Sequence, residues 1–250
     1  MRHQPEGLHH VGRRCLHDRG QGAAARRHGR LRPVAGLQDN AAFLVDTALS
    51  RAGPSRRFII ALAGPPGAGK STLSEAIVAE FIRRGHGAAV VPMDGFHLDN
   101  AVLEARGTLG RKGAPFTFDV DGYASLLGRL LTEPDRDIAV PVFDRDLDLA
   151  RAGGRLITPK HRFLIAEGNY LLLPDPPWAQ LSDLFDLTVM LTADREELRK
   201  RLVERWLAHG LDADAALARA LSNDIPNADL VLRASITADL EIDSGVSAPG

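Results

Sequence analysis

The chain has 250 residues, of which 44% are hydrophobic and 25% are charged, and its formal net charge is −1. This length suits one large α/β domain with a tail, and the nearly neutral charge argues against nucleic acid or an anionic membrane as a partner. The single cysteine, Cys15, excludes an intrachain disulfide framework and a cysteine-rich metal site. Because no apolar run is long enough to span a bilayer, we expect a cytoplasmic protein.

The first 36 residues differ in composition from the rest of the chain. They are rich in Arg, His and Gly, and their apolar residues follow neither a helical nor a strand period. Three interpretations stay open: a disordered basic arm, a targeting peptide, and a wrongly assigned translation start. A nucleic-acid-binding protein would depend on residues 2–32 alone. We therefore expect a tail at 1–36 and a folded domain at 37–250.

Helical and strand-like patterns alternate from residue 37 onward. In chain order they predict a helix at 37–53, a strand at 56–64, a helix at 71–85, a strand at 87–94, a long loop at 99–118, a helix at 120–133, strands at 137–143, within 161–173 and at 184–193, and helices at 194–210 and 212–222. The strands are apolar almost throughout. This pattern predicts an α/β fold with a parallel sheet that helices cover on both faces.

The sequence "GPPGAGKS" at residues 64–71 fits the phosphate-binding pattern G-x-x-x-x-G-K-[ST] and lies between a predicted strand and a predicted helix, as that motif requires. Its glycines let backbone N–H groups turn toward phosphate oxygens, and the helix that follows adds its positive end. Lys70 would reach the β- and γ-phosphates, and the Ser71 hydroxyl would bind Mg²⁺. The predicted nucleotide-binding residues are Gly64, Pro65, Pro66, Gly67, Ala68, Gly69, Lys70, Ser71 and Thr72.

GTPase switches, transport ATPases and small-molecule kinases all carry this motif. A GTPase switch usually has an Asn-Lys-x-Asp sequence that binds the base, and none of the chain's lysines follows an asparagine. A transport ATPase would carry Leu-Ser-Gly-Gly, which the chain lacks. These absences favour a kinase without excluding the other two classes.

Three acids follow predicted strands: Asp94, Asp144 and Glu167. Ligands of an open parallel sheet bind at the carboxyl ends of its strands, so we expect these acids to converge on the edge that holds a magnesium nucleotide. The alternative is that such an acid only forms a turn or caps a helix, and this alternative is strongest for Asp144.

The motifs "GPPGAGKST", "PMDGFHLDN", "RKGAPFTFD", "PVFDR", "EGNYLLL", "RLVERW" and "NDIPNADLV" follow one another in this order. Over residues 37–243 the chain therefore resembles the superfamily of uridine kinase, phosphoribulokinase and bacterial pantothenate kinase. Within it, the chain is most similar to the nucleoside/nucleotide kinase branch, also labelled fructose transport system kinase. The resemblance implies a P-loop NTPase fold with a small helical lid, ATP and Mg²⁺ as cofactors, and transfer of the γ-phosphate to a hydroxyl of a small molecule such as a nucleoside or a sugar. Homodimers are common in this superfamily.

The resemblance also implies roles for single residues. Asp94 would take the proton of the acceptor hydroxyl or hold Mg²⁺ through water, and Glu167 would lie near the metal. Four residues would contact the acceptor: His97, Arg106, Lys112 and Asp144. Two arginines of the lid helix 195–208 would close on the phosphates, Arg201 and Arg205. Asn227 and Ala228 would lie beside the adenine base.

Position 116 departs from the family pattern, which leads us to expect a polar or acidic residue in "KGAPxTFD". The chain has Phe116 there. This departure leaves open a catalytically weak, nucleotide-binding regulatory protein of the same fold.

Overall fold

The computed structural model describes residues 36–54 and 56–245. Within them, five parallel strands form the central sheet, in the order β2–β5–β1–β6–β7. In that order the strands are Ala88–Pro92, Phe163–Gly168, Phe58–Ala63, Leu187–Thr192 and Leu240–Asp243. The predicted parallel sheet is thus confirmed, whereas the predicted tail, apart from Gly36, lies outside the described residues.

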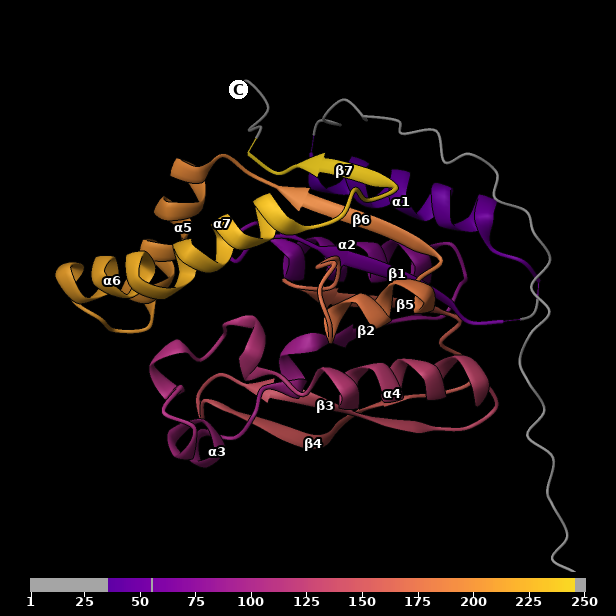
Figure 1. Ribbon diagram of the computed structural model, residues 1–250. Coiled ribbons are helices and arrows are strands. Elements are labelled where there is room, and N and C mark those ends of the chain that lie inside the picture. Colours follow the sequence, from indigo (N-terminus) through magenta and orange to yellow (C-terminus); the bar gives the residue numbers. More distant parts are fainter. Residues whose placement is uncertain (1–35, 55, 246–250) are drawn as a thin grey trace, which may run out of the picture.

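Helices cover both faces of this sheet. Helices α1 (Leu37–Arg51) and α2 (Lys70–Arg83) pack against one face, and α4 (Val120–Thr132) packs against the other (Figure 1). Side chains of β1 alternate between the two hydrophobic clusters, and all six of its residues are buried. A strand enclosed on both sides needs apolar residues throughout, which explains the unbroken apolar run in its sequence.

The chain after β6 forms a group of helices at the carboxyl ends of the strands. It consists of α5 (Arg195–Ala208), α6 (Ala213–Arg219), a π-helical turn (Ala220–Asp224) and α7 (Ile225–Ala234). The arrows of β6 and β7 point toward α5 and α6 (Figure 1). The helices predicted at 194–210 and 212–222 are therefore present, and they stand where a lid over the sheet edge would stand.

The strand predicted at 137–143 exists, but its place in the parallel sheet was predicted wrongly. It is β3 (Ile138–Asp144), and it pairs antiparallel with β4 (Leu149–Ile157) in a separate two-stranded sheet. The connection of residues 145–148 suits a hairpin and is far too short for the crossover that parallel strands need. The strand β4 escaped prediction because most of its residues are exposed and it contains adjacent glycines.

Two further segments differ from the sequence-based prediction. The region 99–118 is not a plain loop, because it holds the short helix α3 (Asn100–Ala105) and two 3-10 turns (Leu109–Arg111 and Pro115–Thr117). The strand β7 was not predicted, since it has only four residues and buries two of them. Among residues 36–54 and 56–245, no helix is both long and apolar enough to cross a membrane.

Candidate active site

The phosphate loop connects β1 to α2 in the predicted way. Gly67 and Gly69 have φ angles of +84° and +87°, in the left-handed region that favours glycine. Helix α2 starts at Lys70, so its free N–H groups face the loop. The Lys70 side chain is only 7% exposed, and its Nζ donates a hydrogen bond to the Pro65 carbonyl at 3.0 Å. Burial lowers the pKa of the Lys70 amine, which the nearby Glu167 carboxylate partly offsets.

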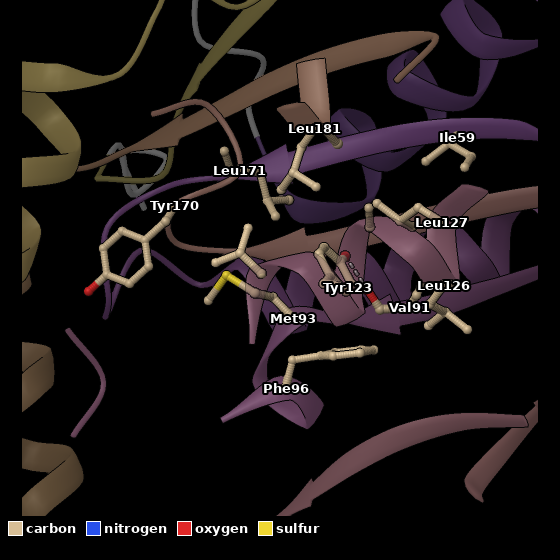
Figure 2. Packing of buried hydrophobic residues seen from close by; sticks show 14 of the residues in the cluster. Ile59, Val91, Met93, Phe96, Tyr123, Leu126, Leu127, Tyr170, Leu171 and Leu181 are labelled. Atoms are coloured by element: carbon tan, nitrogen blue, oxygen red, sulfur yellow. Dashed lines mark hydrogen bonds between the residues drawn. The ribbon is translucent and has the colours of Figure 1, made fainter. Parts of the chain in front are cut away.

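Asp94 projects from a short 3-10 turn, Met93–Phe96, whose two end residues are anchored in the core. The Phe96 ring meets the Tyr123 ring edge-on at 5.0 Å, and the Tyr123 hydroxyl donates to the Val91 carbonyl at 3.0 Å (Figure 2). A Cβ at Gly95 would lie 2.4 Å from the carbonyl oxygen of Pro141, so the turn packs tightly on β3. These contacts on both sides hold Asp94 at the end of β2.

Glu167 lies near the end of β5, where it pairs in register with Pro92 of β2 and Leu62 of β1. The Ser71 hydroxyl donates to Glu167 Oε1 at 3.3 Å. Burial raises the pKa of the Glu167 carboxyl, and the Lys70 ammonium acts in the opposite direction. Ser71, Asp94 and Glu167 therefore bring three hard oxygen donors to one edge of the sheet.

Three cavities adjoin the phosphate loop. The phosphate-loop cavity, about 360 Å³, is lined by Lys70, Ser71, Asp94 and Glu167 among others. The helix α1 cavity, about 390 Å³, shares four residues with it: Gly67, Gly69, Thr72 and Arg201. The His97 cavity, about 130 Å³, shares five: Pro66, Asp94, Arg145, Asn169 and Arg205. The phosphate-loop cavity therefore lies between the other two, with Asp94 on the side toward His97.

The two predicted lid arginines lie at opposite ends of the phosphate-loop cavity. Arg201 faces the helix α1 cavity as well, donating from Nη1 to the Gly67 carbonyl at 3.4 Å and from Nε to Glu197 at 2.7 Å. Arg205 faces the His97 cavity as well, and burial together with the nearby Arg145 lowers the pKa of its guanidinium. Both positions suit contact with phosphates, and Arg201 also has the structural ion pair that its spacing from Glu197 indicates.

His97 and Lys112, which the resemblance assigns to the acceptor, both line the His97 cavity. The His97 ring lies between Phe118 and Phe143, with ring centres 4.1 and 4.6 Å away, and its Nδ1 lies 2.8 Å from the Asp94 carbonyl oxygen. Burial lowers the pKa of the His97 imidazole. The Lys112 ammonium is 2.9 Å from Asp148 Oδ2. His97 is thus both packed and part of the cavity wall.

Asp144 and Arg106 lie away from these cavities. Asp144 accepts hydrogen bonds from the backbone of Asp146 and Leu147 and pairs with Arg151 at 3.1 Å, so it forms the hairpin turn. Its strand does not belong to the parallel sheet. Of the three acids expected at one edge of that sheet, Asp94 and Glu167 therefore lie there and Asp144 does not. Arg106 is exposed at the end of α3 and lines none of the three cavities.

Asn227 and Ala228, which the resemblance places beside the adenine base, lie outside the helix α1 cavity. Ala228 is buried in the core, and Asn227 lines the His97 cavity and not the helix α1 cavity. The Asn227 carboxamide is engaged with the segment 111–113, accepting from Arg111 at 3.5 Å and donating to the Gly113 carbonyl at 3.4 Å. Phe116 is 56% exposed and outside all three cavities, so it blocks none of them.

Arg145, Asn169 and Asn223 are among the residues of the site that sequence reasoning missed. Arg145 Nη2 lies 3.7 Å from Asp94 Oδ2, and Asn169 lines the two cavities that meet at Asp94. Asn223 binds the Lys112 carbonyl at 2.9 Å and Arg111 Nε at 3.0 Å. Each lies inside a motif quoted above, "PVFDR", "EGNYLLL" or "NDIPNADLV", which was the available signal.

Comparison with known proteins gives three informative relatives. A Schizosaccharomyces pombe protein provisionally named as a uridine kinase is 36% identical over 194 residues, 74% of this chain and 82% of that protein. A crystal structure provisionally assigned as a fructose transport system kinase, from Silicibacter sp. TM1040, is 45% identical with a TM-score of 0.76, covering 80% of this chain and 98% of that one. The pantothenate kinase of Enterococcus faecalis is 32% identical over 153 residues, 60% of this chain and 49% of that protein, so the chain spans about half of it.

One family model also matches the chain. It describes the methylmalonyl-CoA mutase-associated GTPase MeaB and matches residues 33–97, which is less than half of the chain. The matched residues include the phosphate loop, the strand β2 and the 3-10 turn that carries Asp94.

Proposed function

This chain belongs to the uridine kinase and pantothenate kinase-like family of P-loop kinases and is an ATP-dependent phosphotransferase for hydroxyl acceptors, and from this premise we propose that its acceptor is a nucleoside or a sugar. The observation that carries the proposal is the position of Asp94, which lines both the phosphate-loop cavity and the His97 cavity. A carboxylate between a phosphate site and a second polar cavity suits a base for a hydroxyl that attacks phosphorus.

The phosphates of ATP would bind at the start of α2. The left-handed glycines of the loop and the first N–H groups of the helix suit an anion, and the buried Lys70 adds a positive charge there. The adenine ring of ATP would then extend into the helix α1 cavity, because that cavity shares Gly67, Gly69 and Arg201 with the phosphate-loop cavity.

The side chains around the phosphate loop fit Mg²⁺. The Ser71 hydroxyl and the Glu167 carboxylate are hydrogen-bonded to each other, and Asp94 lines the same cavity, so the available donors are hard oxygens. Among the described residues, no group of three or more His, Cys, Asp or Glu side chains could hold a metal by itself, which suits an ion completed by phosphate oxygens and water. When bound, the ion would neutralise charge on the β- and γ-phosphates.

The acceptor would occupy the His97 cavity with its hydroxyl toward Asp94. Because the transition state of phosphoryl transfer is loose, the hydroxyl becomes acidic only as the new O–P bond forms, and a carboxylate placed beside it can then accept its proton. Arg145, in contact with Asp94, would keep that carboxylate oriented and place a positive charge near the transferred group. Arg201 and Arg205 of the lid helix would bind the phosphates and exclude water.

An acceptor panel tests this proposal. Purified protein is incubated with MgATP and, one at a time, nucleosides, hexoses and pantothenate, and both ADP release and the phosphorylated product are measured. We expect at least one acceptor to raise turnover well above that of Asp94→Asn. If none does while ATP still binds, the chain is instead a nucleotide-binding regulatory protein of the same fold.

A further inference from the structure

The helix α1 cavity has the size and place of a nucleobase site. Its volume of about 390 Å³ lies within the usual range for small-molecule pockets. One side is formed by the phosphate loop and Arg201, and the other by the first turn of α1, including Leu37 and Asn40. A nucleotide with its phosphates on α2 would therefore bring its base toward α1.

Asn40 has a buried polar atom with no hydrogen-bond partner in the described part of the chain. Asn40 lines this cavity and is only 9% exposed, and within residues 36–54 and 56–245 nothing forms a hydrogen bond with its Oδ1. The same part of the chain has two other such atoms, Arg162 Nε and Ser235 Oγ, and neither residue lines this cavity. Because an unpaired buried carbonyl oxygen is costly, a ligand that supplies a donor to Asn40 gains affinity.

The carboxamide of Asn227, which the family resemblance had placed beside adenine, differs from that of Asn40 in the cavity that it lines and in its hydrogen bonds. It lines the His97 cavity, and both its oxygen and its nitrogen are engaged with Arg111 and Gly113. Among the residues that the structure describes, Asn40 therefore has an acceptor without a partner at the helix α1 cavity, and Asn227 does not.

We propose that Asn40 recognises the 6-amino group of adenine and thereby makes the kinase prefer ATP to 6-oxopurine nucleotides. This inference rests on the proposed function, since it assumes that the phosphates bind at the phosphate loop. Adenine presents an N–H donor at position 6, which Oδ1 can accept, whereas guanine and hypoxanthine present an oxygen acceptor there. The opposite orientation of the amide would present Nδ2 and favour the 6-oxopurines, so the sign of the preference is part of the test.

The experiment compares the binding of ADP and IDP, with Mg²⁺, by calorimetry. This pair changes the group at position 6 without adding the 2-amino group of guanine, and it requires no acceptor and no turnover. We expect wild type to bind ADP roughly tenfold more tightly than IDP, the size of one hydrogen bond to a buried group. In Asn40→Ala the preference should fall to about twofold or less, mainly through weaker ADP binding.

Gln38→Ala is the matched control, because Gln38 is an exposed amide on the same helix and lies outside the cavity. It should keep the preference of wild type. The melting temperature without nucleotide adds a readout that separates recognition from support of the fold. Since Oδ1 has no partner in the described part of the chain, Asn40→Ala should not lower this temperature.

The assignment is overturned if Asn40→Ala keeps the preference unchanged, loses ADP and IDP affinity equally, or shows a marked fall of the nucleotide-free melting temperature. A wild-type preference for IDP would do the same. If wild type binds ADP with the expected preference but phosphorylates no hydroxyl compound, the proposed function fails and the role of Asn40 stands. If wild type binds neither nucleotide, both fail.

Discussion

Nη2 of Arg145 lies 3.7 Å from Oδ2 of Asp94, so the turn of the β3–β4 hairpin contacts the carboxylate at the end of β2. The two residues follow strands of different sheets, and they meet where the phosphate-loop and His97 cavities join. The hairpin is thereby part of the candidate active site, although it lies outside the parallel sheet.

Arg145→Gln should therefore lower kcat by about 100-fold, the usual cost of losing one group that stabilises charge in the transition state. ATP affinity should change little, since Lys70 and the loop backbone remain. The control is Arg151→Gln in the same hairpin, because Arg151 pairs with Asp144 and lines none of the three cavities. Equal losses in both variants would mean that Arg145 only stabilises the hairpin.

Asp94→Asn should lower kcat by roughly 100-fold or more, because the amide cannot accept the acceptor's proton. Its affinity for ATP, measured by calorimetry without acceptor, should stay close to that of wild type. Asp144→Asn keeps the side-chain oxygen that accepts from the hairpin turn, and it should retain activity. A large loss of activity in Asp144→Asn would mean that Asp144 contacts the acceptor although it lines none of the three cavities.

Glu167 should make the binding of magnesium nucleotide depend on pH. Burial raises the pKa of its carboxyl in the free protein, whereas a metal ion favours the carboxylate, so binding should release a proton and weaken as pH falls through that raised pKa. Calorimetry in two buffers of different ionisation enthalpy measures this release. Glu167→Gln cannot titrate and should abolish it, and undiminished release in that variant would rule out Glu167 as its source.

Asn227→Ala should raise the KM of the acceptor by roughly fivefold to tenfold. The substitution removes the hydrogen bonds by which α7 holds the segment 111–113, and this segment contains Lys112. The KM of ATP should not change, since Asn227 is outside the helix α1 cavity. Leu232→Ala is the control, because Leu232 is an exposed residue of the same helix. A rise in the KM of ATP alone would support the adenine contact that the family resemblance implied.

Trp206→Phe should raise ATP hydrolysis without acceptor relative to phosphate transfer. Trp206 Nε1 donates to Asp224 Oδ2 at 2.6 Å and so ties the lid helix α5 to the π-helical turn. Phenylalanine keeps an aromatic ring near Arg205 and Arg219 but loses this hydrogen bond, so the lid should close less firmly and admit water. Leu207→Ala, an exposed neighbour on α5, should keep the ratio of wild type.

The central architecture was predictable because it depends on local signals. Three such signals follow one another in the sequence: the apolar run of β1, the glycines and Lys70 of the loop, and the helical period of α2. Each signal lies within the element that it predicts. The predicted positions of Asp94 and Glu167 at strand ends were confirmed as well, since parallel strands bring their carboxyl ends to one edge.

Long-range pairing accounts for what sequence reasoning missed. An apolar run such as that of β3 does not show whether the strand joins the parallel sheet or a hairpin, because this depends on the strand with which it pairs. Here a four-residue connection pairs β3 with the exposed strand β4, so Asp144 lies away from the site. The same hairpin brought Arg145 to Asp94.

The sequence by itself determined that this protein has a parallel sheet and a phosphate loop, with Asp94 and Glu167 at the ends of strands. Only the tertiary structure decided which side chains share a cavity. It places Asn227 beside the segment 111–113, and among the described residues it gives the oxygen of Asn40, next to the phosphate loop, no hydrogen-bond partner. Both outcomes depend on how helices pack across the sheet, and a hydrogen bond between distant segments has no signature in either segment alone.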